Sequence, residues 1–228
     1  VVYDDVNDYY NYLDSFGDNF FGAPSRSLIP GSYEDITWAL FFVERFDNAF
    51  WQKTWNTINN GSASDFLGAI DATLADYNVS FEEAVAEDYL WHYASGFNNS
   101  STLYGFDERT LYPNPNTDEQ FDGIQLSLSD EERIRPFSGR YYEYDITQET
   151  TNLIRLDILA STSDIQAGII AYYDDTSIQT ALIIEPTSNE LTINETDISF
   201  EGLERIGLVL FNSNSVTTQT AQFQLHDY

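Results

Sequence analysis

The sequence predicts an α+β protein of two domains: an N-terminal helical bundle over residues 1–116, then a C-terminal antiparallel β-sandwich with jelly-roll or Greek-key connections over residues 117–228. A change of period predicts this division. Apolar residues recur at helical spacing up to residue 96, whereas they alternate with polar residues after residue 123. Between these stretches Asn, Ser, Pro and Gly dominate, and two prolines exclude regular structure in residues 112–116.

The central helix of the expected bundle covers residues 32–46. Ser32 and Asp35 have the spacing at which two side chains cap the first turn of a helix. Aromatic residues cover the sides of this segment that its aliphatic residues leave free. Because a helix that is apolar on nearly every side must be wrapped by its neighbours, we expect this one at the middle of the bundle.

Four further helices are expected around it. Capping residues or stop signals mark their ends: Gly17 stops the first, Asp47 or Asn48 caps the second, and Ser62 or Ser64 starts the third. A second capping box, at residues 80–83, opens the last. The four carry the apolar residues of segments 4–16, 50–58, 66–74 and 81–92.

The second half of the chain predicts strands. In residues 153–159, for example, apolar residues alternate with Arg155 and Asp157. Turn signals recur roughly every 8–12 residues, a spacing typical of sandwiches. The expected strands cover residues 124–128, 140–147, 152–159, 166–173, 178–184, 190–194, 205–211 and 217–225.

The composition limits the partners of the chain. Its 38 acidic residues against 9 basic ones give a net charge of −29. We therefore expect no nucleic-acid partner and no binding to anionic membranes, since both need positive charge. No apolar run reaches the roughly 20 residues of a membrane span, so no membrane insertion is expected. The absence of cysteine excludes disulfides, thiolate catalysis and cysteine-bound metal.

The chain begins with Val1 and Val2 instead of Met, which favours a processed product. If the protein is exported, its targeting segment has been removed earlier. We expect an extracellular or cell-surface location.

No complete catalytic motif is present. The two histidines, His92 and His226, fall in different expected domains, and no His-Glu-x-x-His sequence or Gly-x-Ser-x-Gly turn occurs. His92 lies between Trp91 and Tyr93 on an apolar helix, so we expect it to be a hydrogen-bonded packing residue. By itself the chain is predicted not to be catalytic, and no catalytic residue is assigned.

Two kinds of modification or ligand remain open. Acidic clusters supply the hard oxygen ligands that calcium prefers, although none matches an EF-hand loop. The candidate calcium ligands are Asp4, Asp5, Asp8, Asp174 and Asp175. Asn-x-Ser/Thr sequons, which matter only if the host glycosylates asparagine, occur at Asn60, Asn78, Asn98, Asn99 and Asn194.

Three groups of segments carry a resemblance to a known family. The first group is residues 2–9, residues 11–13 and Tyr33 with residues 38–46. The second is residues 80–84 with 91–96 and 111–113, and the third is residues 137–142 with 206–212. Together they resemble the part of a family of secreted bacterial zinc metalloproteases that lies downstream of its active site. The resemblance implies a helical subdomain followed by a β-sandwich, with the His-Glu-x-x-His helix upstream of Val1. No zinc ligand can therefore be assigned in this chain, and zinc is expected only if that upstream half is present.

Two functions are compatible with these features. The first is a non-catalytic exported structural or interaction protein, derived from a metalloprotease-like precursor, that assembles with copies of itself into an extracellular filament or surface layer. The second is the accessory C-terminal part of an active secreted zinc metallopeptidase whose catalytic half lies upstream of Val1. The expected partner is accordingly another copy of the chain or the N-terminal part of its own precursor.

Overall fold

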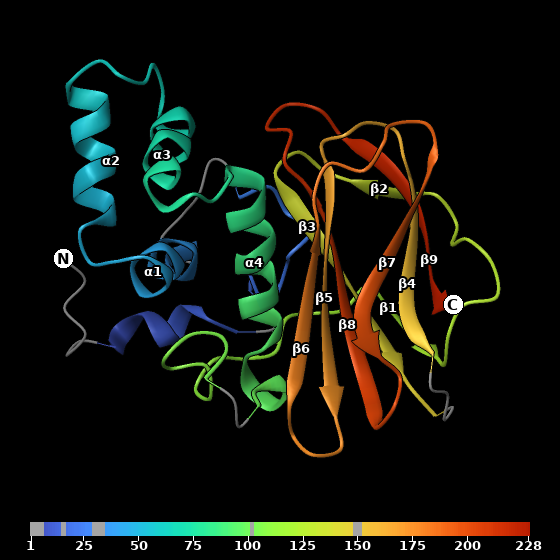
Figure 1. The fold of residues 1–228 in the computed structure, drawn as a ribbon. Coiled ribbons are helices and arrows are strands. Elements are labelled where there is room, and N and C mark those ends of the chain that lie inside the picture. Colours follow the sequence, from blue (N-terminus) through green and yellow to red (C-terminus); the bar gives the residue numbers. More distant parts are fainter. Residues whose placement is uncertain (1–6, 15–16, 29–34, 101–102, 148–151) are drawn as a thin grey trace.

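The computed structural model describes residues 7–14, 17–28, 35–100, 103–147 and 152–228 (Figure 1). The described residues contain four α-helices of 9 to 13 residues and nine strands in two mostly antiparallel sheets. The predicted fold class, a helical bundle followed by a sandwich, is therefore wrong: the chain is predominantly β. The helices are too short and too dependent on the sheet to form a bundle.

The α-helices are α1 (Ile36–Arg45), α2 (Phe50–Asn59), α3 (Phe66–Leu74) and α4 (Phe81–Tyr93). In the described part of the chain three 3₁₀ turns accompany them: η1 (Asn7–Tyr12), η3 (Ala75–Tyr77) and η4 (Gly96–Asn98). The first helix expected from the sequence is thus a short 3₁₀ segment within the described residues.

Of the helix caps expected from the sequence, one is confirmed and others differ in the structure. The hydroxyl of Ser80 accepts a hydrogen bond from the backbone N–H of Glu83 at 3.1 Å, so the cap of α4 is confirmed. Asp65, not Ser62 or Ser64, caps α3 by accepting from the N–H of Gly68 at 2.9 Å. Asp35 makes no side-chain cap bond to α1; its carboxylate instead pairs with the guanidinium of Arg26. Its expected partner Ser32 lies outside the described residues.

The strands form two sheets. The first has the order β1-β3-β8-β5-β6 and the second the order β2-β9-β4-β7. Their bounds are β1 Glu119–Asp122, β2 Glu132–Ile134, β3 Ser138–Asp145, β4 Leu153–Ala160, β5 Ile165–Tyr173, β6 Ile178–Ile183, β7 Leu191–Ser199, β8 Leu203–Asn212 and β9 Gln219–Asp227. All pairs are antiparallel except β1 with β3, which is parallel.

The strand expected at residues 124–128 does not form. The edge position in the first sheet is taken by β1 a few residues earlier, and Gln125 and Ser129 instead donate backbone hydrogen bonds to β9. The short β2 was not expected from the sequence. The other seven expected strands overlap β3 to β9.

Two hydrophobic clusters hold the chain together. One lies between the two sheets and contains aliphatic and aromatic residues from both, such as Leu208 and Phe223. The other joins the helices to the opposite face of the first sheet, and combines Phe42 and Tyr89 with Phe211. Because this second cluster contains residues from both sides of the expected boundary at residues 116 and 117, the helices form a layer on the sheet. The boundary itself stays a prediction.

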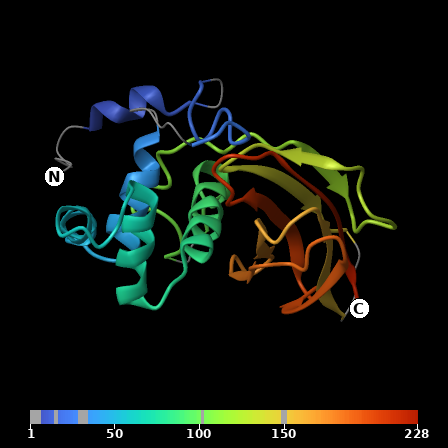
Figure 2. The same cartoon turned by 90° about the horizontal axis from the view of Figure 1, so that it is seen from above.

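Helix α4 is the element that binds this layer to the sheet. It lies between α1 to α3 and the sheet, as both ribbon views show (Figures 1 and 2). Ten of its 13 residues are buried. Three glycines of the sheet allow this close approach. A methyl group on Gly139 or Gly207 would collide with the ring of Tyr89 or Tyr93, and one on Gly168 would lie 3.0 Å from Cγ of Leu90.

Candidate functional site

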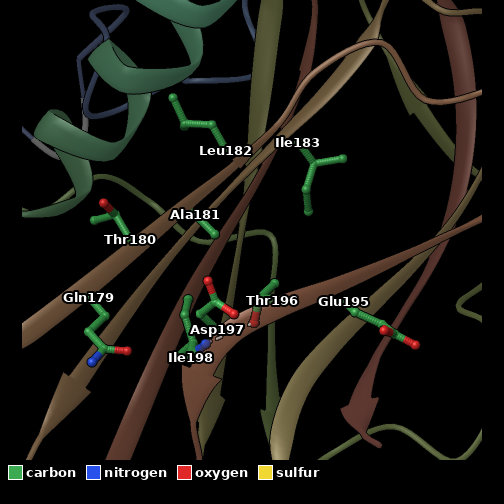
Figure 3. A pocket seen from close by; sticks show the side chains of 9 residues that line it. All are labelled: Gln179, Thr180, Ala181, Leu182, Ile183, Glu195, Thr196, Asp197 and Ile198. Carbon is green, nitrogen blue, oxygen red and sulfur yellow. Dashed lines mark hydrogen bonds between the residues drawn. The ribbon is translucent and has the colours of Figure 1, made fainter.

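Strands β6 and β7 lie together at one edge of the sandwich. Among the strands that the structure describes, each is the last of its sheet, so each has a hydrogen-bonded neighbouring strand on one side only. The two strands together line a groove of about 540 Å³ (Figure 3). An edge strand with free backbone groups is a template for another strand. The groove therefore combines two such templates at one place on the molecule.

The lining of this groove is mixed. From β6 come Gln179, Thr180, Ala181, Leu182 and Ile183, and from β7 come Glu195, Thr196, Asp197 and Ile198. In Figure 3, Thr180 and Leu182 lie on the side of β6 nearer the helices, and Ile183 lies on the other side. Glu195 and Asp197 are exposed, which makes the β7 side of the groove acidic.

The hydrogen-bond pattern of the β5–β6 hairpin shows which groups of β6 are free. The backbone N–H of Tyr173 donates to the carbonyl of Ser177 at 3.1 Å, and the carbonyl of Tyr173 accepts from the N–H of Thr176 at 2.9 Å, so the hairpin closes with Tyr173 hydrogen-bonded to the start of β6. In an antiparallel ladder, hydrogen-bonded pairs alternate with pairs whose backbone groups point away from each other. Ile178, Thr180 and Leu182 therefore direct their N–H and C=O groups outward, away from β5.

Strand β6 also lacks the usual protection of an edge. Its sequence, Ile-Gln-Thr-Ala-Leu-Ile, contains no charged residue and no proline. Edge strands are normally blunted by charges, prolines or bulges. The other three edge strands of the sandwich do carry charges: Glu119 and Asp122 on β1, Glu132 and Arg133 on β2, and Glu195 and Asp197 on β7.

The outer face of the second sheet lies next to the groove and carries a small ionic cluster. Arg155 donates from Nε and Nη2 to the two carboxylate oxygens of Asp157, at 2.7 and 3.0 Å. Nε2 of His226 lies 3.3 Å from Oδ2 of the same carboxylate. Although burial opposes ionisation, these partners hold the pKa of Asp157 below its ordinary value. The three side chains satisfy one another, so the cluster is a fixed part of the sheet surface.

His92 occupies the position expected of a packing residue. It is fully buried, and its ring stacks on Phe20 with the ring centres 3.6 Å apart. Nδ1 lies 2.8 Å from the backbone oxygen of Asp88, and Nε2 lies 2.8 Å from the hydroxyl of Thr37. Both ring nitrogens therefore have partners inside the fold.

Beside it, the carboxylate of Asp88 is fully buried and neither of its oxygens has a hydrogen-bond partner. Nδ1 of His92 lies 3.2 Å from Oδ1, close enough for attraction but outside hydrogen-bond geometry. Burial raises the pKa of Asp88 to about 6, and attraction to His92 opposes that rise only in part.

The candidate calcium ligands are not brought together by the described part of the chain. Asp4 and Asp5 lie outside the described residues, and Asp8 belongs to η1. Asp174 and Asp175 are exposed in the β5–β6 turn, where Asp175 accepts from the N–H of Ser177. No group of three or more His, Asp or Glu side chains with metal-binding geometry occurs among the described residues. Calcium binding stays a prediction.

The sequons differ in exposure. Asn60 and Asn78 are exposed next to α2 and η3, whereas Asn99 and Asn194 are half-buried. Asn98 is buried, and its side-chain oxygen accepts from Arg205 at 2.7 Å. Asn194 donates to the carbonyl of Leu156 at 3.0 Å. Their glycosylation stays a prediction.

Comparison with known proteins gives resemblances over about half of the chain. The pre-peptidase C-terminal domain of a collagenase from Bacillus anthracis is 8% identical, with a TM-score of 0.32 over 50% of this chain and 100% of that one. CorA, a surface-associated copper-binding protein of Methylomicrobium album BG8, is 5% identical, with a TM-score of 0.31 over 49% and 98%. A periplasmic inhibitor of g-type lysozyme from Escherichia coli, a mutant form, is 7% identical, with a TM-score of 0.27 over 47% and 98%.

No protein-family model and no curated protein matches the chain. With no family model to test it, the resemblance to zinc metalloproteases stays a prediction. The helices of the described segments are all too short or too polar to cross a membrane.

The groove was not found by reading the sequence. The run of six uncharged residues in β6 is visible there, but longer uncharged runs occur elsewhere in the chain, such as residues 206–225. Its significance depends on the strand order, which places β6 at an edge and β7 beside it. That order is set by contacts between segments far apart in the sequence.

Proposed function

We propose that this chain is a non-catalytic interaction module that acts outside the cell and assembles with copies of itself through the edge formed by β6 and β7. The supporting observation is the pair of adjacent open strands that flank one groove, one of them without any charge. Backbone hydrogen bonds at such an edge give affinity without a preformed pocket. Contacts made in turn through β6 and through β7 would produce a filament or a surface layer.

The acidic character of the chain fits this function. A charge of −29 keeps separate copies apart at low salt and favours contact only where carboxylates are few or screened. Assembly is then expected to depend on the ionic strength of the surroundings. An accessory role beside an upstream zinc peptidase half has only the sequence resemblance to support it.

The test is the molar mass of the purified chain, measured by light scattering from about 0.1 M to about 1 M NaCl. Over this range the Debye screening length falls from about 10 to about 3 Å. We expect the mass to rise with protein and salt concentration. A variant with a carboxylate on each strand, Thr180→Asp with Ile193→Asp, should stay monomeric. Since both side chains are exposed, this variant is expected to fold. A strict monomer under every condition would contradict the proposal.

A second measurement distinguishes self-assembly from the accessory role beside a zinc peptidase. Material isolated from its native source is analysed for zinc and for a co-purifying fragment with a His-Glu-x-x-His sequence. Stoichiometric zinc with such a fragment would favour the accessory role over self-assembly.

A further inference from the structure

We infer that two copies of the chain pair along β6 in antiparallel orientation, about a two-fold axis that passes through Thr180. This inference rests on the proposed function and adds to it the strand, the partner and the register. The contact would join the first sheets of two copies into one continuous sheet.

The outward backbone groups select this register. Within β6, only Ile178, Thr180 and Leu182 direct N–H and C=O groups away from β5. With the axis at Thr180, Thr180 pairs with itself and Ile178 pairs with Leu182 of the partner copy. All three residues then form hydrogen-bonded pairs, which gives roughly six backbone hydrogen bonds at two per pair.

Neighbouring registers use the edge less well. With the axis at Ala181, Thr180 pairs with Leu182, and Ile178 faces residue 184 of the partner, beyond the end of the strand. With the axis at Gln179, Leu182 faces residue 176 in the hairpin turn. An axis between two residues would oppose side chains that belong to different faces of the sheet, because successive residues alternate.

The side chains fit the same arrangement. Ile178 and Leu182 are half-buried against the cluster that joins the helices to the sheet. In the proposed register each Ile178 lies opposite a Leu182, and Thr180 lies opposite Thr180. Apolar pairs and Thr–Thr pairs are favourable when directly opposed in a sheet. The strand is thus complementary to its own copy.

The distribution of charge over the two edge strands directs a second copy to β6 and a basic peptide to β7. Like charges that lie directly opposite each other in a sheet are destabilising, so two chains of charge −29 can pair most easily along the strand that has none. A basic peptide would gain more at β7, where Glu195 and Asp197 are exposed. The uncharged strand offers such a peptide no complementary charge.

The absence of native cysteine permits a direct test of the register. Single-cysteine variants Thr180→Cys, Ile193→Cys and Val216→Cys are treated with a short bifunctional thiol reagent at high salt. All three native side chains are exposed. Because each chain has one thiol, any cross-linked dimer joins equivalent residues of two copies. We expect Thr180→Cys to cross-link far more than Ile193→Cys on β7 or Val216→Cys in a loop.

A second variant tests the backbone. Thr180→Pro removes an outward N–H that has no partner in β5, so the monomer should keep its thermal midpoint while dimer formation is lost. Thr180→Ala, which keeps the N–H, should still dimerise. If Ile193→Cys cross-links instead, or if association occurs without cross-linking at residue 180, this register is wrong although the proposed function stands. If no variant and no wild-type sample associates, both fail.

Discussion

The substitution Asp88→Asn should stabilise the protein at neutral pH and leave its stability at low pH nearly unchanged. Asp88 is fully buried without a hydrogen-bond partner, and burial raises its pKa from 3.8 to about 6. The folded chain therefore binds this proton more tightly than the unfolded chain. The stability that follows is fully present below about pH 3.8 and is lost as the pH rises through about 6.

The size of the effect follows from the shift. The pKa of Asp88 differs by about two units between the folded and the unfolded chain. At about 1.36 kcal/mol per unit, this corresponds to a loss of about 3 kcal/mol in the unfolding free energy between pH 4 and pH 7. Asparagine has nearly the same shape and cannot ionise, so it does not lose this contribution. The difference in unfolding free energy between Asp88→Asn and wild type should therefore grow from near zero at pH 4 to about 3 kcal/mol at pH 7.

Urea unfolding followed by tryptophan fluorescence at several pH values measures this difference. Asp65→Asn serves as a control of opposite sign, because the N–H of Gly68 and the hydroxyl of Ser64 lower the pKa of Asp65. Its contribution is present above the unfolded pKa and is lost as the pH falls through the folded one. Parallel stability curves for Asp88→Asn and wild type would refute the buried-carboxylate reasoning.

Three further outcomes are expected. Gly207→Ala would force a methyl group into the ring of Tyr93 and should lower the unfolding free energy, measured in urea, by about 1–3 kcal/mol. The control Gly68→Ala on α3 should leave the unfolding free energy unchanged or raise it. Equal losses in the two variants would contradict the close packing of α4 on the sheet. Ser80→Ala removes the hydroxyl that accepts from Glu83 and should cost about 1 kcal/mol by the same assay, whereas no change would mean that the cap is dispensable. The dissociation constant of the wild-type dimer, measured by sedimentation, should fall as NaCl rises; a constant that rises with salt would show that ionic attraction drives assembly.

Local features of the fold were predictable from the sequence. The capping box of Ser80 is confirmed, and the alternation of Arg155 and Asp157 with apolar residues correctly marked β4. These patterns depend on residues within a few positions of each other. A helix cap and a strand period can therefore be read without knowledge of the partner element.

The arrangement of the elements was not predictable in the same way. A helix that is apolar on every side needs neighbours, but the pattern does not say whether they are helices or a sheet. Three isolated glycines inside strands, Gly139, Gly168 and Gly207, were the available signal, since glycine within a strand marks a close approach by another group. They identify the face of the first sheet on which α4 packs.

The candidate site was even less predictable from local sequence patterns. An uncharged run such as residues 178–183 is ordinary in a central strand and significant only at an edge. Edge position results from pairings such as β5 with β8, which join segments about forty residues apart in the chain. Sequence periodicity carries no information on that order.

Light scattering on wild type and Thr180→Pro at the same high salt concentration is the most direct test of assembly through β6. The expected result is a concentration-dependent mass that reaches at least twice the 26.0 kDa of one chain for wild type and stays at one chain for the proline variant. A wild-type chain that remains monomeric, or a proline variant that assembles equally well, would contradict it.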